Sequence, residues 1–187
     1  MLVIIGLGNP GEKYKHSRHN TGWRVVDALA LVQAAESSFK FEKSLEAETL
    51  SLQHAVLVKP QTFMNLSGNA AAKVLKKYDY ARFSKKDFHT VFVVYDDLDI
   101  PVGKYKLVFG SGPKVHNGIN HIKEVLGTDQ FWHIRIGVDG RQGDRSVDPQ
   151  DYVLSGFVPD EQSLLKTVVD DVVELLSESI ENENGEK

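Results

Sequence analysis

The sequence predicts a single α/β domain in which helices flank a mixed β-sheet. The first observation is the length of 187 residues, at which one core can bury roughly two-thirds of the unfolded chain's surface. The second is that short apolar runs, typical of strands, are interspersed with segments of helical periodicity. The third is that no repeat or linker divides the chain. We therefore expect one domain over residues 1–180 and a disordered acidic tail over residues 181–187.

The strands are predicted from apolar runs that end at residues unfavourable to strands. Leu2–Leu7 is rich in Val and Ile and is followed by Gly8. Val91–Tyr95 is a second buried run, which we expect to stop at Asp96, while Lys104–Phe109 alternates like a half-exposed strand. The remaining strand candidates are Phe39–Lys43, Ala47–Leu52, His54–Lys59 and Trp132–Val138.

Four segments have the residue pattern of helices. Asn20–Thr21 supplies capping residue types before a run of helical spacing, and Ser67 is placed to cap a second helix. That second helix is rich in Ala and ends in lysines, which suit the negative end of its dipole. A short helix is expected over His116–Leu126, and a long amphipathic helix is expected from Pro159 onward.

Charge is distributed unevenly along the chain. The net charge is -4, but residues 151–187 contain ten acidic and two basic residues, whereas residues 1–150 contain 20 basic and 16 acidic ones. The basic body favours a polyanionic partner, although a solvated acidic helix on an ordinary domain explains the same numbers. There is no cysteine, which excludes disulfides and thiolate chemistry. No apolar run approaches the ~20 residues needed to cross a bilayer, so we expect a cytoplasmic protein without a membrane partner.

The stretch G-L-G-N-P-G, Gly6–Gly11, spells the dinucleotide fingerprint G-x-G-x-x-G directly after the first expected strand. In dinucleotide folds the helix begins within the glycine loop, and an acidic residue follows about 20 residues further on. Here E-K-Y-K-H-S-R-H-N separates Gly11 from the helical pattern, and position 31 is Leu. The motif lacks both features, so the glycines either only turn the chain or belong to another kind of site.

Polar residues with catalytic potential follow the two strongly buried strands. Asn9 and His19 come after the first strand, and Asp96 comes after the strand Val91–Tyr95. If the two strands are parallel, their ends open on the same crevice. A carboxylate there could bind one imidazole nitrogen and leave the other as a general base. A single loop histidine is also a common surface residue, and this alternative stays open at the level of sequence.

Other chemistries have less support. There is no G-x-S-x-G elbow and no H-E-x-x-H zinc motif. Asp96, Asp97 and Asp99 form a D-D-x-D cluster that could hold Mg²⁺, but adjacent residues of a strand point to opposite faces. What remains is a His–Asp pair with several asparagines, which suits a hydrolase that uses water as its nucleophile and needs no metal or cofactor.

Four long motifs resemble, in order, those of bacterial-type peptidyl-tRNA hydrolase. They are G-L-G-N-P-G-E-K-Y-K-H-S-R-H-N-T-G-W, K-P-Q-T-F-M-N-L-S-G, Y-D-D-L-D-I-P-V-G-K-Y-K-L and H-N-G-I. The resemblance extends from Leu2 to about Ile180. It implies a single α/β domain around a twisted mixed sheet, and a monomer that acts on peptidyl-tRNA during ribosome rescue. The reaction implied is hydrolysis of the ester between the peptide and the tRNA 3′ ribose.

The resemblance also implies roles for the matching residues. His19 resembles the general base that activates water, and Asp96 resembles the partner that orients its ring. Asn9 resembles the residue that distinguishes a blocked from a free aminoacyl group. The remaining matches are substrate contacts at Tyr14, Phe63, Asn65 and Asn117, and tRNA phosphate contacts at Lys106 and Arg135.

One loop departs from the family pattern. Where the family has roughly G-G-G-x-G-G-H-N-G, this chain has G-S-G-P-K-V-H-N-G. Pro113 and Val115 stiffen the loop and Lys114 adds a charge. An alternative interpretation is a non-catalytic RNA-binding paralogue, similar to plant organelle splicing factors that resemble this family.

Overall fold

The computed structural model describes residues 1–34, 38–78, 83, 88–144 and 146–183. Its centre is a seven-stranded sheet in the order β2-β3-β4-β1-β5-β7-β6. The strands are β1 (Leu2–Gly6), β2 (Lys40–Glu42), β3 (Ala47–Ser51), β4 (Ala55–Pro60), β5 (Phe88–Pro101), β6 (Tyr105–Phe109) and β7 (Phe131–Asp139). The α-helices named below are α1 (Thr21–Gln33), α2 (Ser67–Tyr78), α4 (Asn117–Leu126), α5 (Pro149–Leu154) and α6 (Pro159–Asn182).

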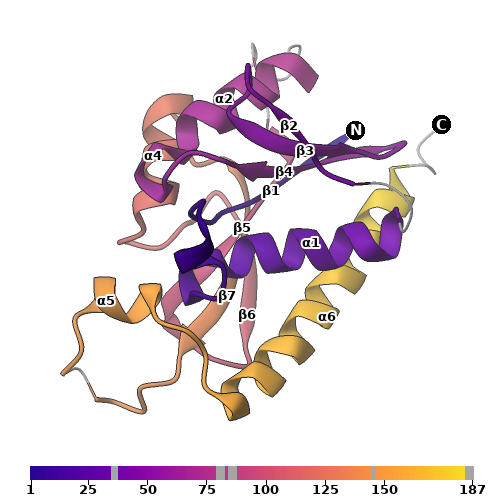
Figure 1. Ribbon diagram of the computed structural model, residues 1–187. Coiled ribbons are helices and arrows are strands. Elements are labelled where there is room, and N and C mark those ends of the chain that lie inside the picture. The colour runs from indigo at the N-terminus through magenta and orange to yellow at the C-terminus, as the bar shows by residue number, and fades with distance from the viewer. Residues whose placement is uncertain (35–37, 79–82, 84–87, 145, 184–187) are drawn as a thin grey trace.

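The sheet is mixed and is covered on both faces. Strands β4, β1, β5 and β7 are parallel neighbours, whereas β2, β3 and β6 join antiparallel. Helices α1 and α6 cover one face, and α2 and α4 cover the other (Figure 1). Because β1 lies between two helical layers, its residues L-V-I-I-G are all buried. The predicted fold class is therefore confirmed.

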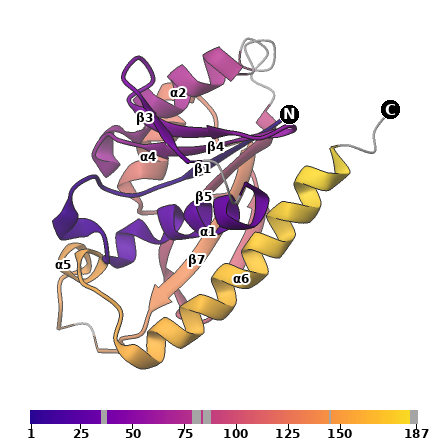
Figure 2. The same cartoon turned by 45° about the vertical axis from the view of Figure 1, so that its right-hand side comes forward.

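The long helix α6 has its apolar stripe on the sheet. It runs diagonally across the face beside α1 and β7 (Figure 2). Leu165, Val168, Val172 and Leu176 are buried there, as the 3.6-residue period predicts, while Leu164 is 48% exposed. Helix α6 continues to Asn182, two residues past the expected boundary at residue 180, and residues 184–187 of the expected tail lie outside the described residues. Among the described residues, no helix is both long and apolar enough to cross a membrane.

Strand β5 is longer than the sequence predicts. It does not stop at Asp96 but continues to Pro101, because β7 pairs with it past that point. On the other side, β1 ends with Gly6 opposite Val94. Asp96 is thus two residues beyond the last β1 pair, where one neighbour has left the sheet. The carboxyl ends of the parallel strands form a crevice at this edge, as α/β folds do around ligands.

The two expected helix caps serve other purposes. Asn20 occupies the N-cap position of α1 but makes no side-chain cap bond. Its Oδ1 accepts from the backbone N–H of Asn9 at 2.9 Å, and its Nδ2 donates to the Asn9 carbonyl at 3.0 Å. Ser67 is the first residue of α2, and its hydroxyl donates to the Met64 carbonyl at 2.9 Å. Both side chains fix loops at the sheet edge instead of capping N–H groups.

Candidate active site

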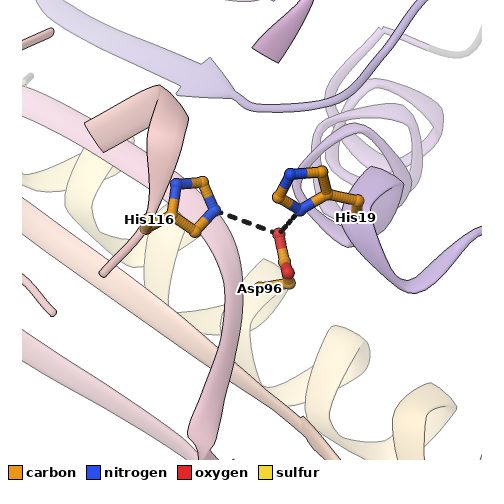
Figure 3. Close-up of side chains that lie close together, drawn as sticks. All are labelled: His19, Asp96 and His116. Carbon is orange, nitrogen blue, oxygen red and sulfur yellow. Dashed lines mark hydrogen bonds and ion pairs between the residues drawn. The ribbon is translucent and has the colours of Figure 1, made fainter. Parts of the chain in front are cut away.

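His19 and Asp96 form a direct pair at the carboxyl edge of the sheet. His19 lies in the short helix η2 (Arg18–Asn20), immediately before α1, and Asp96 lies in β5. The distance from His19 Nδ1 to Asp96 Oδ1 is 2.7 Å (Figure 3). Asp96 is 2% exposed and His19 is 9% exposed. The sequence predicts that these two residues lie in one crevice if the strands before them are parallel. Strands β1 and β5 are parallel, as this prediction requires.

A second histidine, His116, binds the same carboxylate oxygen. Its Nε2 is 3.1 Å from Asp96 Oδ1, and its Nδ1 accepts from the backbone N–H of Ile119 at the start of α4 (Figure 3). The ring of Tyr95 packs edge-on against it at 4.9 Å. The sequence placed His116 at a helix start but assigned it no role in the site. The available signal was its position in H-N-G-I, directly before Asn117.

The charges of this cluster shift two pKa values. Burial alone would lower the pKa of His19, but the charge of Asp96 and its hydrogen bond outweigh burial, so this pKa is raised above 6.5. Burial alone would raise the pKa of Asp96, but His19 and His116 hold it well below its usual range. Asp96 is therefore ionised at neutral pH, and its charge keeps the proton of His19 on Nδ1. Nε2 of His19 is left as the basic nitrogen.

His19, Asp96 and His116 are also the residue types that bind metal ions. One ligand atom from each lies within 4.8 Å of the others. However, the backbone N–H of Ile119 occupies the lone pair on Nδ1 of His116, which places the hydrogen of that ring on Nε2, toward Asp96. To coordinate a cation through Nε2, His116 would have to give up its bond to α4. The arrangement is built for hydrogen bonding.

An open pocket of about 330 Å³ lies beside His19. The predicted substrate contacts all contribute to its wall, together with Asn9: they are Tyr14, Phe63, Asn65 and Asn117. The rings of Tyr14 and Phe63 meet edge to face at 6.5 Å, and Phe63 is 53% exposed. A smaller pocket of about 120 Å³ adjoins it at His19 and Asn117, with Asp96, Leu98 and Val115 in its wall. A larger hollow of about 450 Å³ lies away from this chemistry, beside β2 and β3.

Asn9 is held in one orientation by three hydrogen bonds. Its side-chain Oδ1 accepts from the backbone N–H of Met64 at 2.8 Å. Its backbone N–H and carbonyl both bind the side chain of Asn20. Because Oδ1 takes the bond from Met64, the amide identity of Asn9 is fixed and Nδ2 is its donor group. Asn9 is 6% exposed and lines the pocket, so a donor amide is presented there with little freedom to turn.

The glycines of Gly6–Gly11 allow close packing at this edge. A Cβ on Gly6 would lie 2.4 Å from the Gly22 carbonyl oxygen, and one on Gly8 would lie 2.7 Å from the Trp23 ring. Between Gly11 and α1 the chain forms two short 3₁₀ helices, η1 (Glu12–Tyr14) and η2. The N-terminus of α1 is therefore not in the glycine loop, as a pyrophosphate site requires. Gly6 and Gly8 allow α1 to pack closely against the end of β1 and the loop that follows it.

The two predicted phosphate contacts lie outside both pockets, on the edge strand β6 and on its neighbour β7. Lys106 in β6 is the direct neighbour of Arg135 in β7, and Lys106 is exposed. Arg135 Nε donates to Asp97 Oδ2 at 2.6 Å. Asp97 also accepts from the backbone N–H of Asp99. Asp96 and Asp97 thus serve different partners, as the alternation of a strand predicts.

The loop that departs from the family pattern, residues 110–115, packs against the neighbouring elements β7 and α4. Pro113 is buried, whereas Val115 is 85% exposed at the smaller pocket. A Cβ on Gly112 would lie 3.0 Å from the His133 ring and 3.1 Å from Lys123 Nζ. The loop therefore packs closely on β7 and α4 around Gly112.

Comparison with known proteins gives one consistent result. The chain matches the family model described as peptidyl-tRNA hydrolase over residues 3–187. It is 43% identical over 183 residues to the peptidyl-tRNA hydrolase of Geobacter metallireducens, covering 96% of this chain and 89% of that protein. Identity to the Chloroflexus aggregans protein of the same name is 42% over 182 residues, covering 94% and 92%.

A solved structure shares the fold. The crystal structure of peptidyl-tRNA hydrolase from Acinetobacter baumannii superimposes with a TM-score of 0.83 at 26% identity, covering 99% of this chain and 91% of that one. The match therefore includes the sheet, the flanking helices and the edge at which His19 and Asp96 meet. This chain belongs to the peptidyl-tRNA hydrolase family.

Proposed function

We propose that this chain hydrolyses the ester bond of peptidyl-tRNA, with His19 as the general base. The observation that carries this proposal is the 2.7 Å bond from His19 Nδ1 to the buried Asp96, which leaves Nε2 at an amide-lined pocket. We also propose that the protein acts as a monomer in the cytoplasm, as the family resemblance implies. The alternative of a non-catalytic RNA-binding paralogue is not favoured, because the relatives that match nearly the whole chain are named peptidyl-tRNA hydrolase.

The proposed reaction needs one proton carrier. Nε2 of His19 takes a proton from water as the water oxygen bonds to the ester carbonyl carbon. The negative charge that develops on the carbonyl oxygen is stabilised by a side-chain amide N–H group of the pocket wall, for which Asn117 is our candidate. The bond to the ribose 3′ oxygen then breaks, and that oxygen takes the proton back from His19. Asp96 stays ionised and stabilises the imidazolium in between.

The fixed amide of Asn9 supplies a reason for preferring a blocked substrate. In a peptidyl group the α-nitrogen belongs to an amide, and the carbonyl oxygen of that amide can accept a hydrogen bond from Nδ2 of Asn9. A free aminoacyl group has an ammonium there, which can only donate and would face another donor. Met64 N–H prevents Asn9 from flipping to present its oxygen.

We expect the purified protein to release tRNA from N-acetylaminoacyl-tRNA in the presence of EDTA, and to act much less on the unblocked aminoacyl-tRNA. The hydrogen-bonded state of His116 supports catalysis without a metal. Deacylation of both substrates is followed with and without the chelator. Strict dependence on added divalent metal ion, or an absence of turnover, would contradict the proposal.

We further propose that Lys106 and Arg135 bind tRNA phosphate beside the site. Lys106→Ala should raise KM for full-length substrate and reduce the slope of log affinity against log salt by roughly 0.7 to 0.9. Lys40→Ala is the matched control, because Lys40 is also exposed but lies in β2, at the opposite edge of the sheet. Equal slopes in the wild type and the Lys106 variant would place the tRNA elsewhere.

A further inference from the structure

Arg18, the residue before His19, is a buried charge that the proposed reaction does not use. Its side chain is 4% exposed. Nη2 donates to Glu161 Oε2 at 2.8 Å. The guanidinium carbon lies 4.3 Å from the centre of the Tyr152 ring and 4.5 Å from that of the Phe157 ring. Arg18 is thus paired with a carboxylate and packed against two aromatic rings.

These contacts all come from one segment, residues 152–161, which begins in the wall of the larger site pocket. Gln150, Val153 and Leu154 of α5 line the larger pocket. Backbone hydrogen bonds connect the same two segments. Arg18 N–H donates to the Ser155 carbonyl at 2.9 Å, and Ser17 pairs with Gly156 in a β-bridge. Arg18 therefore connects η2, which carries the proposed base His19, to the segment that forms part of the wall of the proposed substrate pocket.

Glu161 is in turn tightly fixed. Its Oε2 also accepts from the backbone N–H of Val158 at the start of α6, at 2.9 Å. Gly140, at the end of β7, approaches so closely that a Cβ there would lie 1.7 Å from Glu161 Oε1. Gly140 N–H donates to the Tyr152 hydroxyl. The carboxylate that receives Arg18 thus cannot shift without moving α6, β7 and α5.

We propose that Arg18 is a positioning residue for His19: its ion pair with Glu161 fixes η2 against segment 152–161 and so holds the His19 ring at Asp96. The inference rests on the proposed role of His19. A buried ion pair contributes little net stability over apolar residues of similar size. However, the directional hydrogen bonds of the Arg18–Glu161 pair hold η2 in one position. This matters for His19, because a small displacement of a catalytic group lowers the reaction rate.

The test separates stability from positioning by using a double variant. Arg18→Met leaves the charge of Glu161 buried and unpaired, so both the melting temperature and kcat should fall. In Arg18→Met with Glu161→Gln no unpaired charge remains, and the amide oxygen that replaces the carboxylate can still accept from Val158 N–H. We expect the melting temperature to recover toward the wild-type value. We expect kcat on N-acetylaminoacyl-tRNA to stay lower by on the order of 10- to 100-fold, with KM within about twofold.

Lys59→Met is the matched control. Lys59 is 12% exposed at its side chain and pairs with Asp27 and Glu48, neither of which lines the two site pockets. Its loss should lower the melting temperature without lowering kcat. Because the double variant buries no unpaired charge, its kcat tests the positioning role of Arg18 even if Arg18→Met fails to fold.

Two results would overturn the inference in distinguishable ways. Wild-type kcat in the double variant, together with an inactive His19→Ala, would mean that the ion pair only stabilises the fold. Near-normal kcat in His19→Ala would overturn the role of His19 and the inference with it.

Discussion

His19→Ala is expected to lower kcat for hydrolysis of N-acetylaminoacyl-tRNA by on the order of 10²–10⁴-fold, the range of a lost general base. Without the imidazole, the attacking water has no acceptor for its proton, and the ribose oxygen has no donor as it leaves. The amides of the pocket remain, so substrate binding should be retained. Rates are measured with saturating substrate, so that the loss is assigned to kcat and not to KM.

His16→Ala provides the matched control for this variant. His16 is exposed, three residues before His19 in the same segment, and lines neither pocket. Its removal should leave kcat unchanged, and both variants should unfold at temperatures close to that of the wild type. Near-normal turnover by His19→Ala would show that His19 is not the base, and an equal loss in His16→Ala would show that the loss is not specific to His19.

Asp96→Asn is expected to lower kcat by on the order of 10²-fold, less than the loss of His19 itself but severe. An asparagine keeps the size of the side chain and removes the charge that stabilises the imidazolium. Because His19 Nδ1 and His116 Nε2 both approach Oδ1, the amide oxygen should take that position and accept from both rings, so the variant removes mainly the charge. His116 would keep its bond to Ile119 N–H, so α4 and the pocket should stay in place.

The measurement is the same deacylation assay combined with thermal unfolding. A variant with intact folding and a strongly reduced kcat supports the role of Asp96 in orienting His19. Wild-type kcat in a folded Asp96→Asn protein would contradict it.

The parts of the fold that depend on periodicity could be predicted from the sequence. The apolar run before Gly6 and the stripe on α6 identify elements that must be buried, and burial set their positions. Parallel pairing of β1 and β5 then follows the common α/β arrangement, and it brings Asp96 toward His19. For this reason the sequence could predict that His19 and Asp96 lie close together.

The parts that depend on local competition between hydrogen bonds could not be predicted. Asn20 has the right residue type and position for a cap, but the backbone of Asn9 binds its side chain instead. His116 joins Asp96 only because the start of α4 comes over the sheet edge. Helix α5 is six residues long and has a single buried residue, Tyr152, so it has no apolar periodicity to detect.

Ion pairs across the sheet are a further limit of sequence reasoning. The resemblance marks Arg135 as a phosphate contact, but nothing in the order of residues indicates that Asp97 already binds it at 2.6 Å. Arg18 is a similar case, because its partner Glu161 is 143 residues away in the chain. Such pairs depend on which segments the fold brings together.

The most direct test of a base held by Asp96 is the pH dependence of kcat/KM in the wild type and in Asp96→Asn. His19 must be neutral to act, and its pKa is raised above 6.5 by Asp96 against the effect of burial. The rate should therefore fall tenfold per pH unit on the acid side, with a midpoint above 6.5. In Asp96→Asn burial acts without the opposing charge, so the midpoint should move to lower pH. This account would be contradicted if kcat/KM did not fall at low pH in the wild type, or if the midpoint of that fall were the same in Asp96→Asn.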